Sequence, residues 1–174
     1  MTDVRHGTAG DDSALQKMAE LIPGYIGYRE RERRRDDDRL LRNHLVKLLD
    51  ATRAKAEHIM RQLGTSDLQL VGKIGALQRR LTALRDRVDH AGYGYTGFFD
   101  AVKIDTEQLE RMYDYDMSLM SPIADMDDTV SQIGEAEADD CADLLNQLSE
   151  RMDVFAQMLD NRDEAVRELT FGEQ

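Results

Sequence analysis

The chain has 174 residues, a formal net charge of −12 at pH 7, one cysteine and no tryptophan. This length suffices for one domain with its own hydrophobic core, so no disulfide or metal is needed to hold the fold. The lone Cys141 cannot form an intramolecular disulfide, and the first ten residues lack the apolar segment of a signal peptide. No apolar run reaches the roughly 18 residues that a membrane span needs. We therefore expect a cytoplasmic protein in which Cys141 is a core residue.

The charges are distributed unevenly along the chain. Residues 29–99 carry 16 basic and 10 acidic side chains, a net +6, whereas residues 100–174 carry 5 basic and 21 acidic side chains, a net −16. Two interpretations are open: the basic helices pack against the acidic ones in one bundle, or a basic face stays exposed for an acidic partner. The overall negative charge disfavours nucleic acid as a partner.

The first predicted elements are a disordered tail and a short helix. Residues 1–11 are polar and contain two glycines, which is typical of a tail without fixed structure. Apolar residues at helical spacing follow, and Asp12 or Ser13 can cap the helix that they predict. Pro23 and Gly24 are expected to end this helix.

The second predicted helix, residues 26–63, has two different halves. Its first half, residues 29–39, is almost entirely charged, and opposite charges recur about one helical turn apart, as in Arg35 and Asp38. This half is predicted to be a solvated helix. The second half carries apolar residues spaced alternately by three and four positions, which is the pattern of a coiled-coil seam. Gly64 is expected to end the helix.

A third helix is predicted over residues 67–90, where six apolar residues follow the same four-and-three spacing. It leads into the sequence AGYGYTGFFDAVKI, residues 91–104, which we call the glycine–aromatic segment. This segment holds three glycines and four of the ten aromatic residues of the chain. It interrupts the helical pattern, so we predict a loop with a short helical piece around residues 98–102.

Two further long helices are predicted in the acidic part of the chain. The fourth covers residues 106–134, and Pro122 in its middle predicts a kink near residues 118–122. The fifth covers residues 138–169 and carries a seam of nine positions at heptad spacing.

Four long helices with short connections predict an all-α fold, an antiparallel four-helix bundle with a short extra N-terminal helix. We expect one domain over residues 12–170 and a frayed C-terminus over residues 171–174. The heptad seams can be satisfied within one chain or between chains, so a homo-oligomer is also compatible with the pattern.

Two seam positions break the apolar pattern, because Asp116 lies on the fourth predicted helix and Arg162 on the fifth. A charge at a seam position is costly unless it is paired. Asp116 and Arg162 are therefore candidates for a buried pair that fixes the register of the helices. The alternative is that one or both lie at the rim of the bundle.

No catalytic, cofactor or metal signature emerges from the sequence. The segment Gly92 to Gly97 matches G-x-G-x-x-G, but a helix is predicted before it where a nucleotide site needs a strand. A ferritin-like metal site needs glutamate three residues before a histidine. The residues three positions before the four histidines are Asp3, Leu41, Lys55 and Arg87. We therefore expect no enzyme activity and no bound metal.

The glycine–aromatic segment is the strongest candidate site. In an antiparallel bundle, its aromatic side chains lie at the same end as the tyrosines that begin the second predicted helix. Such a cluster is costly to expose, so it forms either a structural plug or a binding site for a partner. The candidate anchors of a partner site are Tyr25, Tyr28, Tyr93, Tyr95, Phe98 and Phe99.

Two short motifs are familiar: IPGYIGY at residues 22–28 and GYTGFFDAVKI at residues 94–104. Together they resemble an uncharacterised family of bacterial helical proteins associated with SPFH-domain and zinc-ribbon proteins of membrane-stress or scaffolding systems. The resemblance covers only these two motifs. It implies a bacterial accessory protein and supplies no catalytic residue.

The sequence thus predicts a non-catalytic adaptor or scaffold that binds another protein through the aromatic end of the bundle. The alternative is a peripheral membrane-associated stress protein that uses the basic start of the second helix. A metal-binding bundle ranks third, because the histidine spacing disfavours it.

Overall fold

The computed structural model describes residues 11–101 and 103–171. This part of the chain is mainly helical and contains no strand. None of its helices is long and apolar enough to cross a membrane. Its elements in chain order are α1 (Asp11–Leu21), η1 (Arg31–Arg33), α2 (Arg34–Leu63), α3 (Leu68–His90), η2 (Ala91–Gly94), α4 (Thr96–Asp100), α5 (Thr106–Ser118), α6 (Met120–Glu135) and α7 (Ala138–Phe171).

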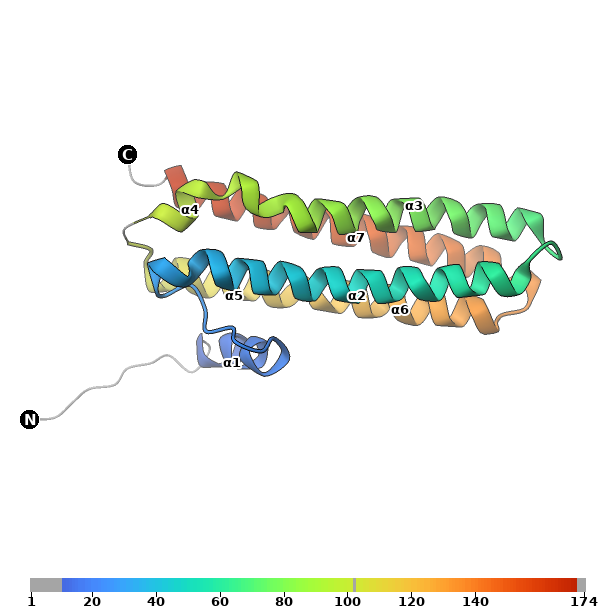
Figure 1. Ribbon diagram of the computed structural model, residues 1–174, viewed down its shortest axis with the longest axis horizontal. Coiled ribbons are helices and arrows are strands. Elements are labelled where there is room, and N and C mark those ends of the chain that lie inside the picture. Colours follow the sequence, from blue (N-terminus) through green and yellow to red (C-terminus); the bar gives the residue numbers. More distant parts are fainter. Residues whose placement is uncertain (1–10, 102, 172–174) are drawn as a thin grey trace, which may run out of the picture.

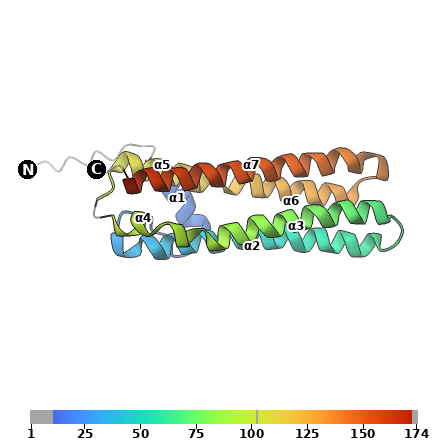
Figure 2. The same ribbon diagram turned by 90° about the horizontal axis from the view of Figure 1, so that it is seen from above.

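The long helices lie side by side along one axis (Figures 1 and 2). Helix α2 packs against α3 and α6, and α7 packs against α3, α5 and α6. Apolar side chains from all of these helices form one continuous core. Helix α1 lies outside this group and packs against α5, while the short α4 packs against α7. The start of α2, the end of α3 and the start of α5 therefore meet at one end of the molecule.

The second helix begins later than its sequence predicts, at Arg34 instead of residue 26. Gly24 and Gly27 have positive φ angles of 85° and 90°, which a helix cannot accommodate. Gly27 also lies against α5, where a Cβ atom would stand 2.6 Å from the hydroxyl oxygen of Tyr113. The segment that joins α1 to η1 is thus a folded turn held on α5, and no side chain fits at Gly27.

The kink predicted near residues 118–122 is a break between two helices. Helix α5 ends at Ser118 and α6 begins at Met120, with Pro122 in its first turn. Proline has no amide hydrogen, and its ring clashes with the carbonyl group four residues earlier, which here belongs to Ser118. Two shorter helices therefore take the place of the single fourth helix.

The remaining boundaries differ by a few residues from those predicted. The glycine–aromatic segment forms η2 and then α4, so its helical piece lies at residues 96–100 instead of 98–102. The predicted tail overlaps α1 at Asp11, and the rest of it, residues 1–10, lies outside the described residues. The predicted frayed end overlaps α7 at Phe171, and residues 172–174 also lie outside them.

Basic helices do pack against acidic ones, as the first interpretation of the charge asymmetry predicts. Arg80 on α3 donates to Asp153 on α7 at 2.5 Å, and Arg87 donates to Asp160 at 2.7 Å. Lys55 on α2 likewise meets an aspartate of α6. The opposite charges of the two halves therefore face each other along much of the molecule.

Candidate functional site

The aromatic end is mostly closed. Five of the six predicted anchors lie in the core, with at most 5% of each side chain exposed: Tyr25, Tyr28, Tyr95, Phe98 and Phe99. The ring of Tyr28 stacks on Tyr113 with centroids 5.7 Å apart and meets the ring of Phe98 edge-on at 5.3 Å. Tyr93 differs from all of these, because 86% of it is exposed. In this structure only Tyr93 is accessible to a partner among the predicted anchors.

A buried arginine joins the two aromatic motifs. Arg34, the first residue of α2, donates from Nε to the carbonyl oxygen of Tyr28 at 2.8 Å and from Nη1 to that of Ala101 at 2.7 Å. The amide of Tyr28 donates in turn to the hydroxyl of Tyr113 at 2.9 Å. The turn before η1 and the end of α4 are thus held side by side, although 67 residues separate Arg34 from Ala101. The interpretation of residues 29–39 as a solvated helix is therefore wrong in part.

Asp116 and Arg162 lie together in the core, at the centre of a buried polar network. Arg162 donates from Nε to Asp116 at 2.5 Å and from Nη2 to Asp38 at 2.8 Å. The hydroxyl of Tyr28 donates to the second oxygen of Asp116 at 2.5 Å. Arg42 donates from Nε to the second oxygen of Asp38 at 2.8 Å. The network thus joins α2, α5 and α7 with the turn before η1.

The electrostatics of this network favour a structural role. Burial raises the pKa of Asp116 even though Arg162 opposes the shift. Asp116 and Asp38 together outweigh the burial of Arg162 and hold its pKa well above the usual value, so the guanidinium stays charged. Burial also raises the pKa of Tyr28, which remains a neutral donor. The oxygens of both aspartates are satisfied by neighbours, so the arrangement suits a fixed register better than proton transfer.

Sequence reasoning missed Asp38, although a signal for it exists. Asp38 stands three positions before Leu41 and seven before Leu45, so it continues the seam of α2 toward the N-terminus. Because nearly all residues around Asp38 are charged, it was not recognised as a seam position. Asp37 is also buried, with one oxygen accepting from the amide of Ile26 at 3.4 Å. Its other oxygen has no hydrogen-bond partner among the described residues, and burial raises the pKa of this carboxyl group.

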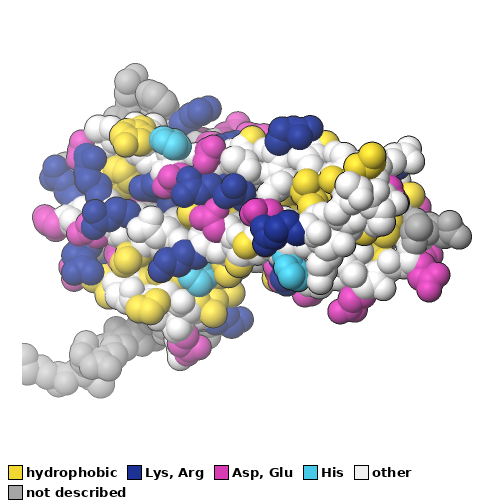
Figure 3. Space-filling model, turned by 45° about the vertical axis from the view of Figure 1, so that its right-hand side comes forward, with side chains coloured by type: hydrophobic (Ala, Val, Ile, Leu, Met, Phe, Trp, Pro, Cys, Tyr) yellow, Lys and Arg dark blue, Asp and Glu magenta, His cyan; other side chains and the backbone are white. Residues whose placement is uncertain are grey.

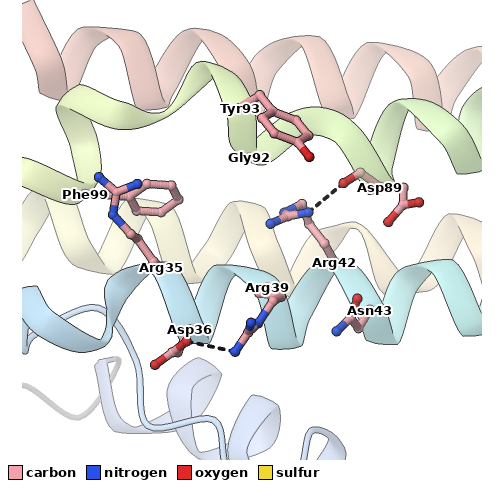
Figure 4. A pocket seen from close by; sticks show the side chains of 9 residues that line it. All are labelled: Arg35, Asp36, Arg39, Arg42, Asn43, Asp89, Gly92, Tyr93 and Phe99. Carbon is pink, nitrogen blue, oxygen red and sulfur yellow. Dashed lines mark hydrogen bonds and ion pairs between the residues drawn. The ribbon is translucent and has the colours of Figure 1, made fainter.

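An open groove of about 560 Å³ lies beside the closed aromatic cluster (Figure 4). On one side stand Arg35, Arg39 and Arg42, which follow one another along α2 at spacings of four and three residues. On the other side stand residues from the end of α3, from η2 and from α4. We call this feature the arginine groove, and its lining consists of Arg35, Asp36, Arg39, Arg42, Asn43, Asp89, Gly92, Tyr93 and Phe99.

The arginines of the groove are held to different degrees. Arg42 forms the floor, because its Nη1 donates to the carbonyl oxygen of Asp89 at 2.7 Å while its Nε is bound to Asp38. Gly92 leaves room for this guanidinium, since a Cβ atom there would lie 2.5 Å from Nη2 of Arg42. Arg35 and Arg39 are more exposed, with 56% and 65% of their side chains accessible.

The surface around the groove is more basic than its sequence indicates. Residues 29–39 contain six arginines and five acidic residues. Asp37, Asp38 and Arg34 are buried, which leaves five arginines and three acidic residues nearer the surface. Figure 3 shows Lys and Arg side chains gathered toward the left-hand end of the molecule. The second interpretation of the charge asymmetry, an exposed basic face, therefore also applies at this end.

Three other candidate sites were considered from the sequence: a metal site, Cys141 and the segment Gly92 to Gly97. In the described part of the chain, no group of three or more His, Cys, Asp or Glu side chains is placed to hold a metal ion. Cys141 is buried, and burial raises the pKa of its thiol. The segment Gly92 to Gly97 spans η2 and the start of α4 and follows α3, so it lacks the strand that a nucleotide site needs.

Comparison with protein-family models, with curated proteins and with solved structures yields no match. No residue role is therefore transferred from another protein. The roles assigned below depend on the contacts, burial and charges of this chain.

Proposed function

We propose that this protein is a non-catalytic adaptor or scaffold that binds another protein at the aromatic end of an antiparallel four-helix bundle with an extra N-terminal helix. The observation that carries the proposal is the 86% exposure of Tyr93 at the rim of the arginine groove. Tyrosine and arginine are, with tryptophan, the residues most enriched among those that dominate binding energy at protein interfaces.

The predicted anchors take two different roles in this proposal. Tyr93 contacts the partner, together with the exposed arginines of the groove. Tyr25, Tyr28, Tyr95, Phe98 and Phe99 are packed inside, and they support the surface from below. A surface whose supporting side chains are already fixed loses less conformational freedom on binding, which favours affinity. The resemblance of the two motifs to bacterial scaffolding-associated proteins agrees with this role in a cytoplasmic accessory protein.

A second candidate is a peripheral membrane protein, which the exposed Arg35 and Arg39 favour. Two features oppose it. The arginines line a concave groove, where a flat lipid surface makes poor contact, and the whole chain carries a net charge of −12 that anionic lipids repel. Binding to anionic vesicles that weakens as salt is added would support this second candidate.

The proposal is tested by affinity capture from native lysate with the wild type and a Tyr93→Ala variant. We expect the wild type to retain a specific protein and the variant to lose most of it, because truncating an interface anchor weakens binding by about tenfold or more. Leu68→Ala is the matched control, since Leu68 is 70% exposed at the opposite end of the bundle. Equal capture by all three proteins would refute a binding role for Tyr93.

A further inference from the structure

We propose that the occupant of the arginine groove is an acidic segment of the partner protein. Its carboxylates bind Arg35 and Arg39, and a neighbouring side chain packs on Tyr93. This inference rests on the proposed function, because it specifies the partner chemistry of the same groove.

The exposed arginines of the groove already bind carboxylates of this chain. Arg35 donates to Asp100 at 2.9 Å, and Arg39 donates to Asp36 at the same distance. Both pairs are more than half exposed, and exposed ion pairs contribute little stability. A carboxylate from a partner can therefore replace Asp100 or Asp36 at little cost. Guanidinium groups bind carboxylates with two parallel hydrogen bonds, which favours this class of ligand.

The spacing of the arginines suits a short peptide segment. Arg35 and Arg39 are four residues apart on α2, which corresponds to about 6 Å along the helix axis. Alternate residues of an extended chain are separated by about 6.5 Å and point to the same side. Two acidic residues at alternate positions of an extended segment would thus reach both arginines at once.

Two contacts hold the groove in a binding-ready form. The guanidinium of Arg35 lies over the ring of Phe99, 5.0 Å from its centroid, which restricts its movement. Arg42 is fixed between Asp38 and the carbonyl oxygen of Asp89. The groove therefore combines a fixed floor with two arginines whose present partners are exchangeable.

The lining favours a single peptide segment over a membrane or nucleic acid. The arginines line a concave groove, which a single extended chain can enter but a flat lipid surface or a wide duplex contacts poorly. An acidic segment of such a chain can displace Asp100 from Arg35 and Asp36 from Arg39. The exposed ring of Tyr93 offers an apolar contact that a polyphosphate surface does not use.

The binding test uses a fluorescein-labelled octaglutamate peptide, with octaserine as the uncharged control, and follows fluorescence anisotropy with the full chain at low salt. We expect saturable binding of octaglutamate that weakens as salt is added. No binding of octaglutamate, or equal binding of both peptides, overturns the proposal. Binding to phosphatidylserine vesicles with no binding of octaglutamate also overturns it.

Paired variants assign the binding to the groove. Arg35→Gln/Arg39→Gln should weaken octaglutamate binding about fivefold to twentyfold, because two ion pairs to the peptide are lost. The control Arg61→Gln/Arg79→Gln removes two exposed arginines elsewhere on α2 and α3 and should leave binding near the wild-type value. Equal weakening by both pairs places the binding outside the groove and overturns the proposal.

A gain of binding gives the sharpest test, since misfolding cannot produce it. Asp36→Asn/Asp100→Asn removes the competing carboxylates and should tighten binding about twofold to fivefold. The control Asp114→Asn/Asp128→Asn changes the net charge equally at exposed positions of α5 and α6 and should have a smaller effect. If both double variants bind octaglutamate more tightly by the same factor, the net charge of the protein alone explains the gain, and the proposal is overturned.

The two proposals fail separately. If Tyr93→Ala abolishes capture of a protein partner but octaglutamate does not bind, the adaptor function stands and the acidic ligand is wrong. If Tyr93→Ala captures the same proteins as the wild type, the adaptor function at this end is wrong.

Discussion

Arg34 and Arg35 are neighbours in one charged run, but they belong to different parts of the molecule. Arg34 is buried and bonds to backbone carbonyl groups of two loops, whereas 56% of the Arg35 side chain is exposed beside the groove. The same contrast separates the buried Asp38 from the exposed Asp36. A single run of arginine and aspartate thus supplies both part of the polar interior and part of the groove surface, and the fold decides which residues are buried.

The largest loss of stability is expected for the double variant Phe98→Ala/Phe99→Ala. Truncating a buried phenylalanine costs about 3–5 kcal/mol through lost burial and the cavity that remains. Both rings are at most 5% exposed, so the double variant should be largely unfolded. Circular dichroism with thermal and urea unfolding measures this. Near-wild-type stability would mean that these rings do not support the core.

Arg162→Ala should be the next most damaging change. It leaves Asp116 and Asp38 buried without their shared cation, a situation that typically costs about 3–5 kcal/mol. Arg39→Ala is the surface counterpart and should change the free energy of unfolding by less than about 1 kcal/mol. Urea unfolding of the two variants measures the contrast. Similar stabilities would show that the buried network contributes no more than an exposed ion pair.

Asp37→Asn should have a smaller effect that depends on pH. Burial raises the pKa of Asp37 in the folded protein above its unfolded value. The stability that this group contributes is therefore present below the unfolded pKa, about 4, and is lost as pH rises through the folded pKa. We therefore measure the free energy of unfolding of both proteins from pH 4 to pH 7. The stability of Asp37→Asn relative to the wild type should increase as pH rises.

The neighbouring Asp36→Asn variant controls for that effect, because Asp36 is exposed and bound to Arg39. If the stability difference from the wild type depends on pH in the same way for Asp36→Asn and Asp37→Asn, burial of Asp37 is not the cause of the pH dependence.

The smallest effect on stability is expected for Tyr93→Ala. With 86% of the residue exposed, its truncation should change the free energy of unfolding by less than about 0.5 kcal/mol. The loss of partner capture proposed for this variant would then reflect binding alone. A destabilisation of several kcal/mol would instead assign Tyr93 to the packing of the bundle.

Periodicity predicted the parts of the structure that depend on local sequence. The apolar seams indicated the long helices, Pro122 indicated the break near residue 119, and the charges at seam positions marked Asp116 and Arg162. The spacing of apolar residues carries this information because helical faces repeat every 3.6 residues.

The features that the sequence did not predict depend on contacts between residues far apart in the chain. Gly27 adopts a positive φ and fits closely against Tyr113, a contact that no local pattern reveals, so the start of α2 was predicted too early. The order of the predicted helices placed the aromatic residues at one end. Which of these residues are buried and which, like Tyr93, are exposed depends on the path of η2 and α4. The groove itself arises from α2 and α3 together, and Gly92 acquires its role only because Arg42 lies beneath it.

Asp38 is shared between the groove and the interior, since one oxygen accepts from Arg42 and the other from Arg162. Arg42 therefore cannot leave the floor of the groove without breaking a hydrogen bond to the residue that also holds Arg162. This single carboxylate thus joins the floor of the groove to the side chains that hold α5 and α7 together.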